Sequence, residues 1–234
     1  MLGHQVYLIE EFKQASKHHG AVSQRPEHLG TSRTLYGLKN AVRRDIIHAW
    51  IENHQDITFD DWVSLIDGLY HGISYEERCT PPTLFTKYRA YRQQVSLSQL
   101  DRWLGQLEGW AEVDSTCQSV FTAQDMLANW DGWRDLLERL TQDENINKRR
   151  ASLVLLTTPI TNSPDKRLIQ QALKHVDILK HENDKLITKA ISWVLRKGIK
   201  QHRADIESYL DQHADTLPAI AVRETRRKLE TGKK

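Results

Sequence analysis

The segment from Leu107 to Ser115 places an aromatic side chain and a carboxylate four residues apart, at Trp110 and Asp114. If the segment is helical, this spacing puts both side chains on one face, one turn apart. Such a pair suits a cationic, planar ligand, because the ring face attracts positive charge and the carboxylate adds Coulomb attraction. The same carboxylate could orient a water molecule for attack. The alternative is structural: Trp110 would pack in the core or line a groove, and Asp114 would cap the start of a helix.

Two later segments carry residues that such chemistry could use. Residues 147–155 have a basic start followed by an apolar run suited to a buried helix. Residues 189–197 are strongly helical in pattern, and Trp193 has basic residues on both sides. Each has a structural alternative, because an Arg pair at a helix start is usually solvated and a Trp among Ile, Val and Leu usually belongs to the core. The basic candidates for ligand contacts are Lys148, Arg149, Arg150, Lys189, Arg196 and Lys197.

Charge is distributed unevenly along the chain, although the formal net charge is only +2. Residues 101–145 hold ten acids and three bases, which is a balance of −7. Residues 146–203 hold thirteen bases and four acids, which is a balance of +9. A basic block of this size indicates contact with a polyanion such as DNA phosphate. The alternative is a solvated, lysine-rich helical surface.

Composition argues against several classes of protein. Cys79 and Cys117 are the only cysteines, which favours a reducing compartment and disfavours a disulfide framework or a Cys-based zinc site. The histidines are scattered and fit no closed metal-ligand spacing. The apolar runs are too short to span a membrane, and the N-terminus lacks the features of a signal peptide. We therefore expect a cytoplasmic protein without a metal or cofactor.

Apolar residues recur at helical intervals along almost the whole chain, so we predict an all-α fold in one domain, residues 1–234. The roughly twelve expected helices are typical of HEAT-like or ARM-type repeats, and would form about six antiparallel pairs in a curved solenoid with a concave basic groove. We expect Pro81-Pro82 to break or kink a helix opened by Ser74-x-x-Glu77, unless the prolines lie in its first turn. Further expectations are an irregular segment at 20–30, one helix over 113–128, a loop at 157–164, a helix end at Gly198 and a frayed basic tail from about 226.

Taken together, three segments resemble the AlkD-like DNA alkylation repair glycosylases. They are Trp110-Ala111-Glu112-Val113-Asp114, Arg150-Ala151-Ser152-Leu153 and Lys189-Ala190-Ile191-Ser192-Trp193-Val194-Leu195-Arg196, and the third is the most specific. Weaker similarity is present at Tyr36–Arg44, Glu76-Glu77-Arg78 and Leu217–Glu224, so the resemblance covers about Tyr36 to Leu229.

The resemblance implies helical pairs that wrap around one side of duplex DNA. It implies a monofunctional glycosylase of base excision repair that hydrolyses the bond to cationic N-alkylated purines, such as 3-methyladenine and 7-methylguanine. We also expect a monomer that needs no cofactor. By position, Asp114 would be the catalytic carboxylate, Trp110 and Trp193 would flank the sugar of the lesion, and Arg150 would contact nearby phosphate or sugar. We expect the protein to be associated with the nucleoid when it is bound to DNA, and to hold the DNA through its phosphates.

Two other functions remain compatible with the sequence. The first is a non-catalytic HEAT-repeat protein that binds DNA structure, and retention of Asp114 favours the enzyme over it. The second is a peptide-binding helical scaffold, which the basic block after Ile146 disfavours. A third aromatic residue, which the N-terminal segment of the family supplies, is not assigned in this chain.

Overall fold

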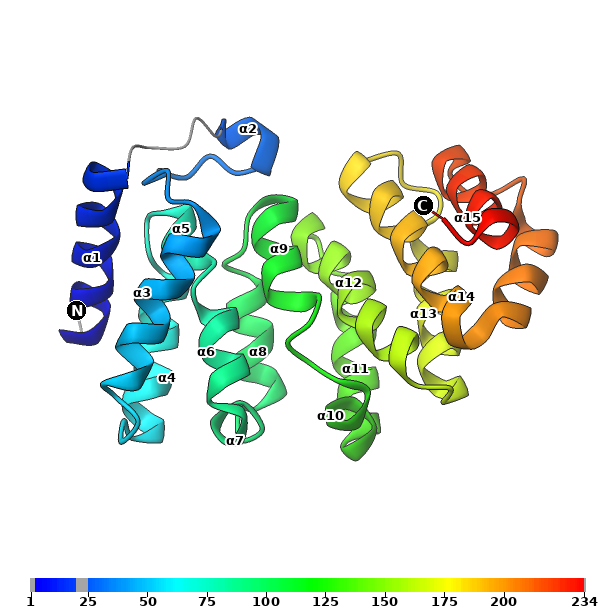
Figure 1. Ribbon diagram of the computed structural model, residues 1–234. Coiled ribbons are helices and arrows are strands. Elements are labelled where there is room, and N and C mark those ends of the chain that lie inside the picture. The colour runs from blue at the N-terminus through cyan, green and yellow to red at the C-terminus, as the bar shows by residue number, and fades with distance from the viewer. Residues whose placement is uncertain (1–2, 20–24, 234) are drawn as a thin grey trace. The chain divides into compact units, whose positions relative to one another are not determined.

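In the computed structural model, which describes residues 3–19 and 25–233, the chain folds into α-helices joined by short connections (Figure 1). Over those ranges, β-type pairing is limited to one isolated parallel bridge between Thr34 and Ser74. The predicted all-α, helical-repeat fold class is confirmed. Contacts divide the chain into two compact units, Met1–Thr116 (unit 1) and Cys117–Lys234 (unit 2). The single domain, the curved stack and its concave basic groove stay predictions.

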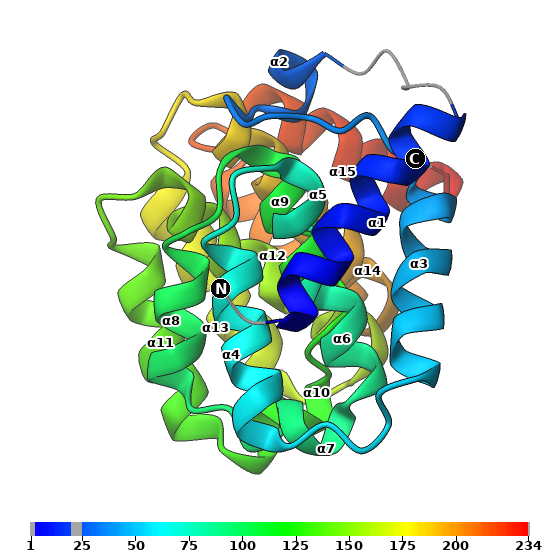
Figure 2. The same cartoon turned by 90° about the vertical axis from the view of Figure 1, so that its left-hand side faces the viewer.

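Unit 1 is built on large aromatic side chains. Figure 2 looks onto this unit, with α1 in front, and α1 contacts both α3 and α4. Trp50, Trp62 and Trp103 are almost completely buried between the helices. The helices are α1 Gly3–His19, α2 Pro26–Leu29, α3 Asn40–Glu52, α4 Phe59–Tyr70, α5 Tyr75–Arg78, α6 Pro81–Lys87, α7 Arg89–Arg92, α8 Leu97–Leu104 and α9 Gly109–Cys117.

The predicted capping box is present at the start of α5. The Ser74 hydroxyl accepts the Glu77 backbone N–H, and the Glu77 carboxylate accepts the Ser74 backbone N–H at 3.0 Å. The helix ends at Arg78, and Pro81 and Pro82 occupy the first turn of α6. A first-turn proline loses no intrahelical hydrogen bond. The prolines therefore separate two short helices instead of kinking one.

Unit 2 is organised around α12, which contacts α11, α13 and α14. Residues 150–157 of α12 are all buried, so this part of the helix is enclosed around its whole circumference. The helices are α10 Ala123–Ala128, α11 Trp130–Thr141, α12 Ile146–Asn162, α13 Lys166–Leu179, α14 Lys185–His213 and α15 Ala219–Thr231.

The predicted loop at 157–164 is wrong for residues 157–162, because α12 continues to Asn162 with Pro159 inside it, and the connection to α13 is limited to residues 163–165. The threonine hydroxyls, which favour turns in many sequences, donate to carbonyls of the same helix: Thr157 to Val154 at 2.7 Å and Thr161 to Thr157 at 2.6 Å. Pro159 and Ile160 are buried. Tertiary packing therefore overrides the local signal for a loop.

The predicted helix end at Gly198 is also wrong. A Cβ at Gly198 would lie 3.1 Å from Ile169 Cδ1 and 3.0 Å from Ile206 Cδ1, so the glycine permits close packing within unit 2. The chain turns four residues later, at His202, where φ is −132° and ψ is 39°.

Three other boundaries differ from expectation. Residues 113–128 form parts of two helices, because Thr122 and Asp125 make a capping box that starts α10. The tail expected to fray from about 226 is helical up to Thr231. In the segment expected to be irregular, Pro26–Leu29 form the short helix α2, and residues 20–24 lie outside the described residues.

Candidate functional site

Helix α9 presents Trp110 and Asp114 one turn apart. The helix begins at Gly109, so Asp114 lies in its middle and the N-cap alternative for this residue is wrong. Asp114 is half-buried, and Trp110 is 42% exposed, which is high for a tryptophan. The alternative of a buried core residue is therefore wrong for Trp110. This face of α9 combines an exposed ring with a carboxylate.

The Trp110 ring is held by the segment that follows α2. Its indole N–H donates to the His28 carbonyl at 2.7 Å. Below the ring, the chain crosses itself at two glycines, Gly30 and Gly109, and both have φ of +72°. A Cβ on Gly109 would lie 2.1 Å from the Gly30 oxygen, so only glycine fits there. The glycine before Trp110 is the sequence signal for this crossing.

Glu112 fixes the opposite side of α9. Its side chain is completely buried and accepts hydrogen bonds from the Thr31 hydroxyl at 3.1 Å, Arg33 Nε at 3.1 Å and the Glu108 backbone N–H at 2.8 Å. Burial raises the pKa of Glu112, and the Glu108 hydrogen bond and the Arg33 charge oppose that rise. Glu112 therefore anchors residues 31–33 to the helix that carries Trp110 and Asp114. Sequence reasoning missed it, because a Glu between two candidates resembles an ordinary surface residue.

The basic residues at the start of α12 are engaged within unit 2. Arg149 Nε donates to Glu182 at 2.8 Å, and its Nη1 donates to the carbonyls of Asp143 and Glu144. Lys148 Nζ lies 3.2 Å from Asp143 Oδ2. Arg150 is only 4% exposed, and its Nη1 donates to the Leu186 carbonyl near the start of α14. These contacts join α12 to the 143–145 turn and to α14.

The first half of α14 presents a second group of candidate residues. Lys189, Trp193, Arg196 and Lys197 follow helical spacing, and Lys189 is exposed while Trp193 is half-buried. Trp193 is thus less buried than its neighbours Ser192 and Val194, which are both in the core.

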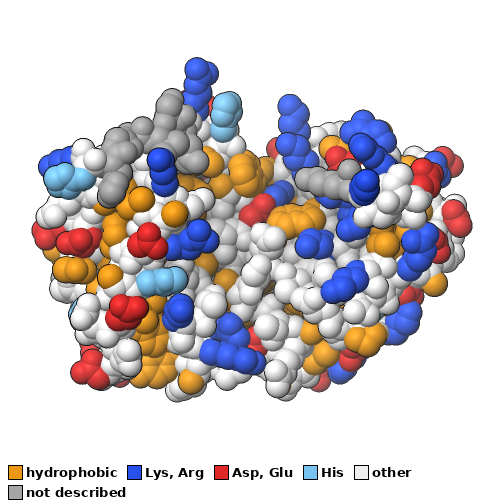
Figure 3. Space-filling view, viewed as in Figure 1, with side chains coloured by type: hydrophobic (Ala, Val, Ile, Leu, Met, Phe, Trp, Pro, Cys, Tyr) orange, Lys and Arg blue, Asp and Glu red, His pale blue; other side chains and the backbone are white. Residues whose placement is uncertain are grey.

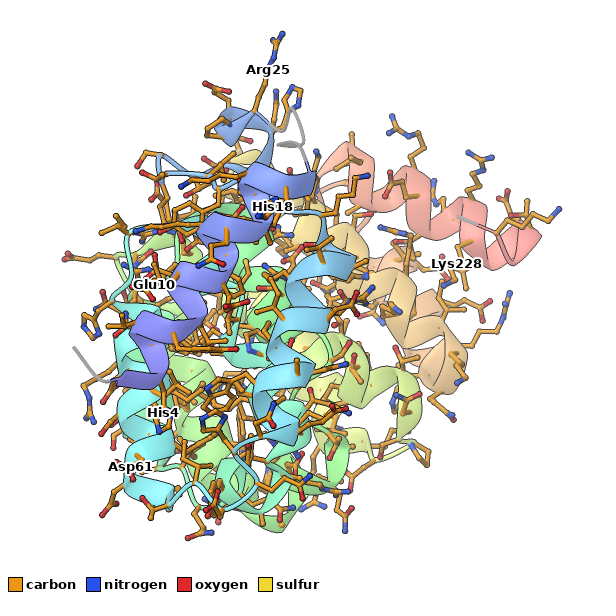
Figure 4. All side chains as sticks on the ribbon, turned by 60° about the vertical axis from the view of Figure 1, so that its left-hand side comes forward. His4, Glu10, His18, Arg25, Asp61 and Lys228 are labelled. Carbon is orange, nitrogen blue, oxygen red and sulfur yellow. The ribbon has the colours of Figure 1, made fainter. Side chains whose placement is uncertain are left out.

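Helix α15 extends this cationic surface. Arg196 Nη2 lies 3.3 Å from Glu224 Oε2, which joins the two helices. Burial lowers the pKa of Lys228, and the charges of Arg196 and Lys197 lower it further, so three cations are close together. Figure 4 shows Lys228 on α15 beside α14, and on the face seen in Figure 3 basic side chains gather over these two helices. Cations that lie close together favour an anionic ligand, because the ligand offsets their mutual repulsion.

The structure thus brings together Trp110 with Asp114 in unit 1, and Lys189, Trp193, Arg196 and Lys197 in unit 2. Within the described residues, no group of three or more His, Cys, Asp or Glu side chains could hold a metal ion. None of the helices described is long and apolar enough to cross a membrane. Chemically, the α9 face can stabilise positive charge with a ring and a carboxylate.

Comparisons with known proteins agree with the resemblance found in the sequence. Residues 8–229 match the sequence pattern of a family described as DNA alkylation repair enzyme. A solved structure described as a predicted DNA alkylation repair enzyme from Enterococcus faecalis has the same fold, with a TM-score of 0.70 and 16% identity, and the similarity covers 96% of each chain. No curated protein matches the sequence.

Proposed function

Because the chain belongs to the DNA alkylation repair enzyme family, we propose that it is a monofunctional DNA glycosylase of base excision repair. Its substrates are duplex DNA sites with cationic N-alkylated purines, such as 3-methyladenine and 7-methylguanine. It works as a cytoplasmic monomer, bound to the nucleoid when engaged, and it needs neither metal nor cofactor. The family is described as DNA alkylation repair enzyme, which implies a role in the repair of alkylation damage with DNA as the partner.

The observation that carries the proposal is the exposed Trp110 ring one helical turn from the half-buried Asp114. An exposed tryptophan costs hydrophobic free energy that a core position would recover. The hydrogen bond to the His28 carbonyl and the crossing of Gly30 with Gly109 hold the ring in this position. A fixed, exposed ring beside a carboxylate is suited to a cationic substrate.

The chemistry proposed for Asp114 follows from the charge of the substrate. An N-alkylated purine carries a positive charge, so the glycosidic bond breaks with its electron pair going to the base nitrogen, and the base leaves neutral. The sugar acquires oxocarbenium character, which the Asp114 carboxylate stabilises. Asp114 then accepts a proton from a water molecule as the water oxygen bonds to the sugar carbon. The products are a free base and an abasic site.

Unit 2 contributes cations and a second ring to the proposal. Lys189 and Lys197 contact phosphates, and Trp193 contacts the sugar beside the lesion. Arg150 acts from its buried position, where its contact with the Leu186 carbonyl supports the start of α14. Lys148, Arg149 and Arg196 reach phosphate only if they exchange their acidic partners for it. We therefore rank them below Lys189 and Lys197 as DNA contacts.

The test is Asp114→Asn, which keeps the shape of the side chain and removes its charge. We expect single-turnover release of 7-methylguanine to slow by roughly two orders of magnitude or more, with Tm and duplex affinity nearly unchanged. Asp211→Asn is the matched control, because Asp211 is an exposed carboxylate on α14, and this variant should keep full activity. A destabilised but fully active Asp114→Asn would remove this residue from the mechanism. A wild-type protein that binds duplex yet releases no base would support the DNA-structure-binding alternative.

A further inference from the structure

Arg43, in the first turns of α3, is a buried cation, and two of its three nitrogens have no hydrogen-bonding partner. The residue is 8% exposed, and its Nε and Nη1 atoms are sealed from solvent with no acceptor in range. No carboxylate of the described residues lies within ion-pair distance of it, whereas buried Arg78 donates to the carbonyls of Gly72 and Gln106. Nη2 is not among these buried atoms, so it is the nitrogen that we assign to the approach of a ligand.

Tyr75 and Cys79 connect the surroundings of Arg43 with the helix that carries Asp114. Burial raises the pKa of Cys79 and of Tyr75, and the Arg43 charge opposes both rises, so the guanidinium lies near both groups. The Ser115 hydroxyl donates to Cys79 Sγ at 3.5 Å. Ser115 directly follows Asp114, so Cys79 contacts α9 and is also influenced by the Arg43 charge.

An arrangement of this kind is expensive for the free protein. A buried guanidinium without a partner loses hydration and gains neither Coulomb attraction nor hydrogen bonds in return. Unpaired buried donors are rare in native proteins and need an explanation. A planar guanidinium binds phosphate oxygens with two parallel N–H groups, which would satisfy the donors that are now unpaired.

We propose that Arg43 is an oxyanion-binding residue that receives a backbone phosphate of the DNA. The ligand approaches Nη2, and the flexible stem of the side chain turns to bring a second N–H onto the same phosphate. This inference rests on the proposed function only for the identity of the ligand, since DNA supplies the phosphate. The site itself follows from the geometry of Arg43 in unit 1.

The experiment compares Arg43→Met with Arg44→Met. Both variants lose one positive charge from α3, but Arg44 is exposed and serves as the matched control. Inorganic phosphate should raise the Tm of the wild type and of Arg44→Met, and should not raise that of Arg43→Met. For an undamaged duplex, Arg43→Met should bind about tenfold more weakly at physiological salt, with the salt slope reduced by about one. Without phosphate, its Tm should equal or exceed that of the wild type, because an unpaired buried charge has been removed.

Arg43→Lys provides a second variant, which keeps the positive charge and removes the two parallel N–H groups of the guanidinium. It should keep the salt slope and bind several-fold more weakly. If Arg43→Met lowers the Tm while the phosphate shift and the salt slope persist, Arg43 is structural and the proposal fails. The same conclusion follows if Arg43→Lys binds with unchanged affinity. This experiment does not depend on base release. A wild-type protein that releases no base would therefore refute the glycosylase proposal without affecting the test of Arg43.

Discussion

Replacing Gly109 by alanine tests whether the crossing beneath Trp110 positions the ring. Gly109 has φ of +72°, and its new Cβ would lie 2.1 Å from the oxygen and 2.4 Å from the carbonyl carbon of Gly30. These atoms belong to the backbone, so no side-chain rotation relieves the contact. Either residues 29–31 move away from α9 or α9 starts later. Both responses break the bond from the Trp110 indole to the His28 carbonyl.

Substitutions at two other glycines separate the causes of the expected loss of stability. Gly232 has φ of +70° with nothing within 4 Å of a new Cβ, so Gly232→Ala measures backbone strain alone. We expect about 1 kcal/mol, since the left-handed region costs a non-glycine residue roughly 1–2 kcal/mol and this position lies near the chain end. Gly30→Ala adds a contact of 3.3 Å with Gly109 Cα. Gly109→Ala adds the overlap with the Gly30 carbonyl group. This overlap should cost roughly 1–3 kcal/mol more, which is the range for overpacked protein cores.

The assay is the free energy of unfolding by urea, together with single-turnover base release for each variant. The loss of stability should increase from Gly232→Ala through Gly30→Ala to Gly109→Ala. Base release should be normal in Gly232→Ala and reduced about tenfold in Gly109→Ala, because a displaced Trp110 forfeits a contact of about 0.5–2 kcal/mol. If Gly109→Ala unfolds as easily as predicted but releases base at the normal rate per folded molecule, the crossing is a device for stability and does not position the ring.

Two further predictions concern the aromatic residues and the buried histidine. Trp110→Ala and Trp193→Ala should each slow base release by roughly tenfold, less than Asp114→Asn, and a rank order with either tryptophan ahead of the carboxylate would contradict the proposed mechanism. Burial lowers the pKa of His175 to about 4, where it accepts from Gln171 Nε2 and donates to the Ser152 carbonyl. Between pH 6.5 and 4, His175 is therefore protonated in the unfolded chain and neutral in the folded chain. Unit 2 should lose about 3 kcal/mol of stability as the pH falls through this range. His175→Gln should remove that part of the loss in urea titrations, and an unchanged pH dependence would refute the assignment.

Helical periodicity predicted the fold class because it reports which face of each segment is buried. The errors fell where a residue had two physical uses. Pro159 ends many helices, yet here it lies inside buried α12, where packing compensates for the missing N–H. Gly198 suggested a helix end, but it makes room for Ile169 and Ile206. Sequence alone does not distinguish a glycine that ends a helix from one that lets two helices approach.

The same distinction applies to the candidate site. The condition on which Trp110 and Asp114 would share a helical face is met, because α9 begins at Gly109, four residues before the start of the helix expected over 113–128. The residues that hold this face, Glu112 and the Gly30 backbone, come from parts of the chain whose contacts are not encoded in local spacing. The proposed role of Arg43 could not be predicted from the sequence either, because it depends on buried nitrogens that lack a partner, and only three-dimensional packing shows this.

Charge counting is where sequence and structure differ most. The balance of +9 over residues 146–203 treats every cation as available. In the structure Lys148, Arg149 and Arg196 pair with Asp143, Glu182 and Glu224, so these cations already have anionic neighbours. A phosphate that replaced such a neighbour would leave a carboxylate facing the DNA, and much of the Coulomb gain would be lost. The salt slope of duplex binding should therefore depend mainly on four cations that have no acidic partner of this kind: Lys189, Lys197, Lys228 and Arg43. Only such cations gain a new ion pair when they contact a DNA phosphate.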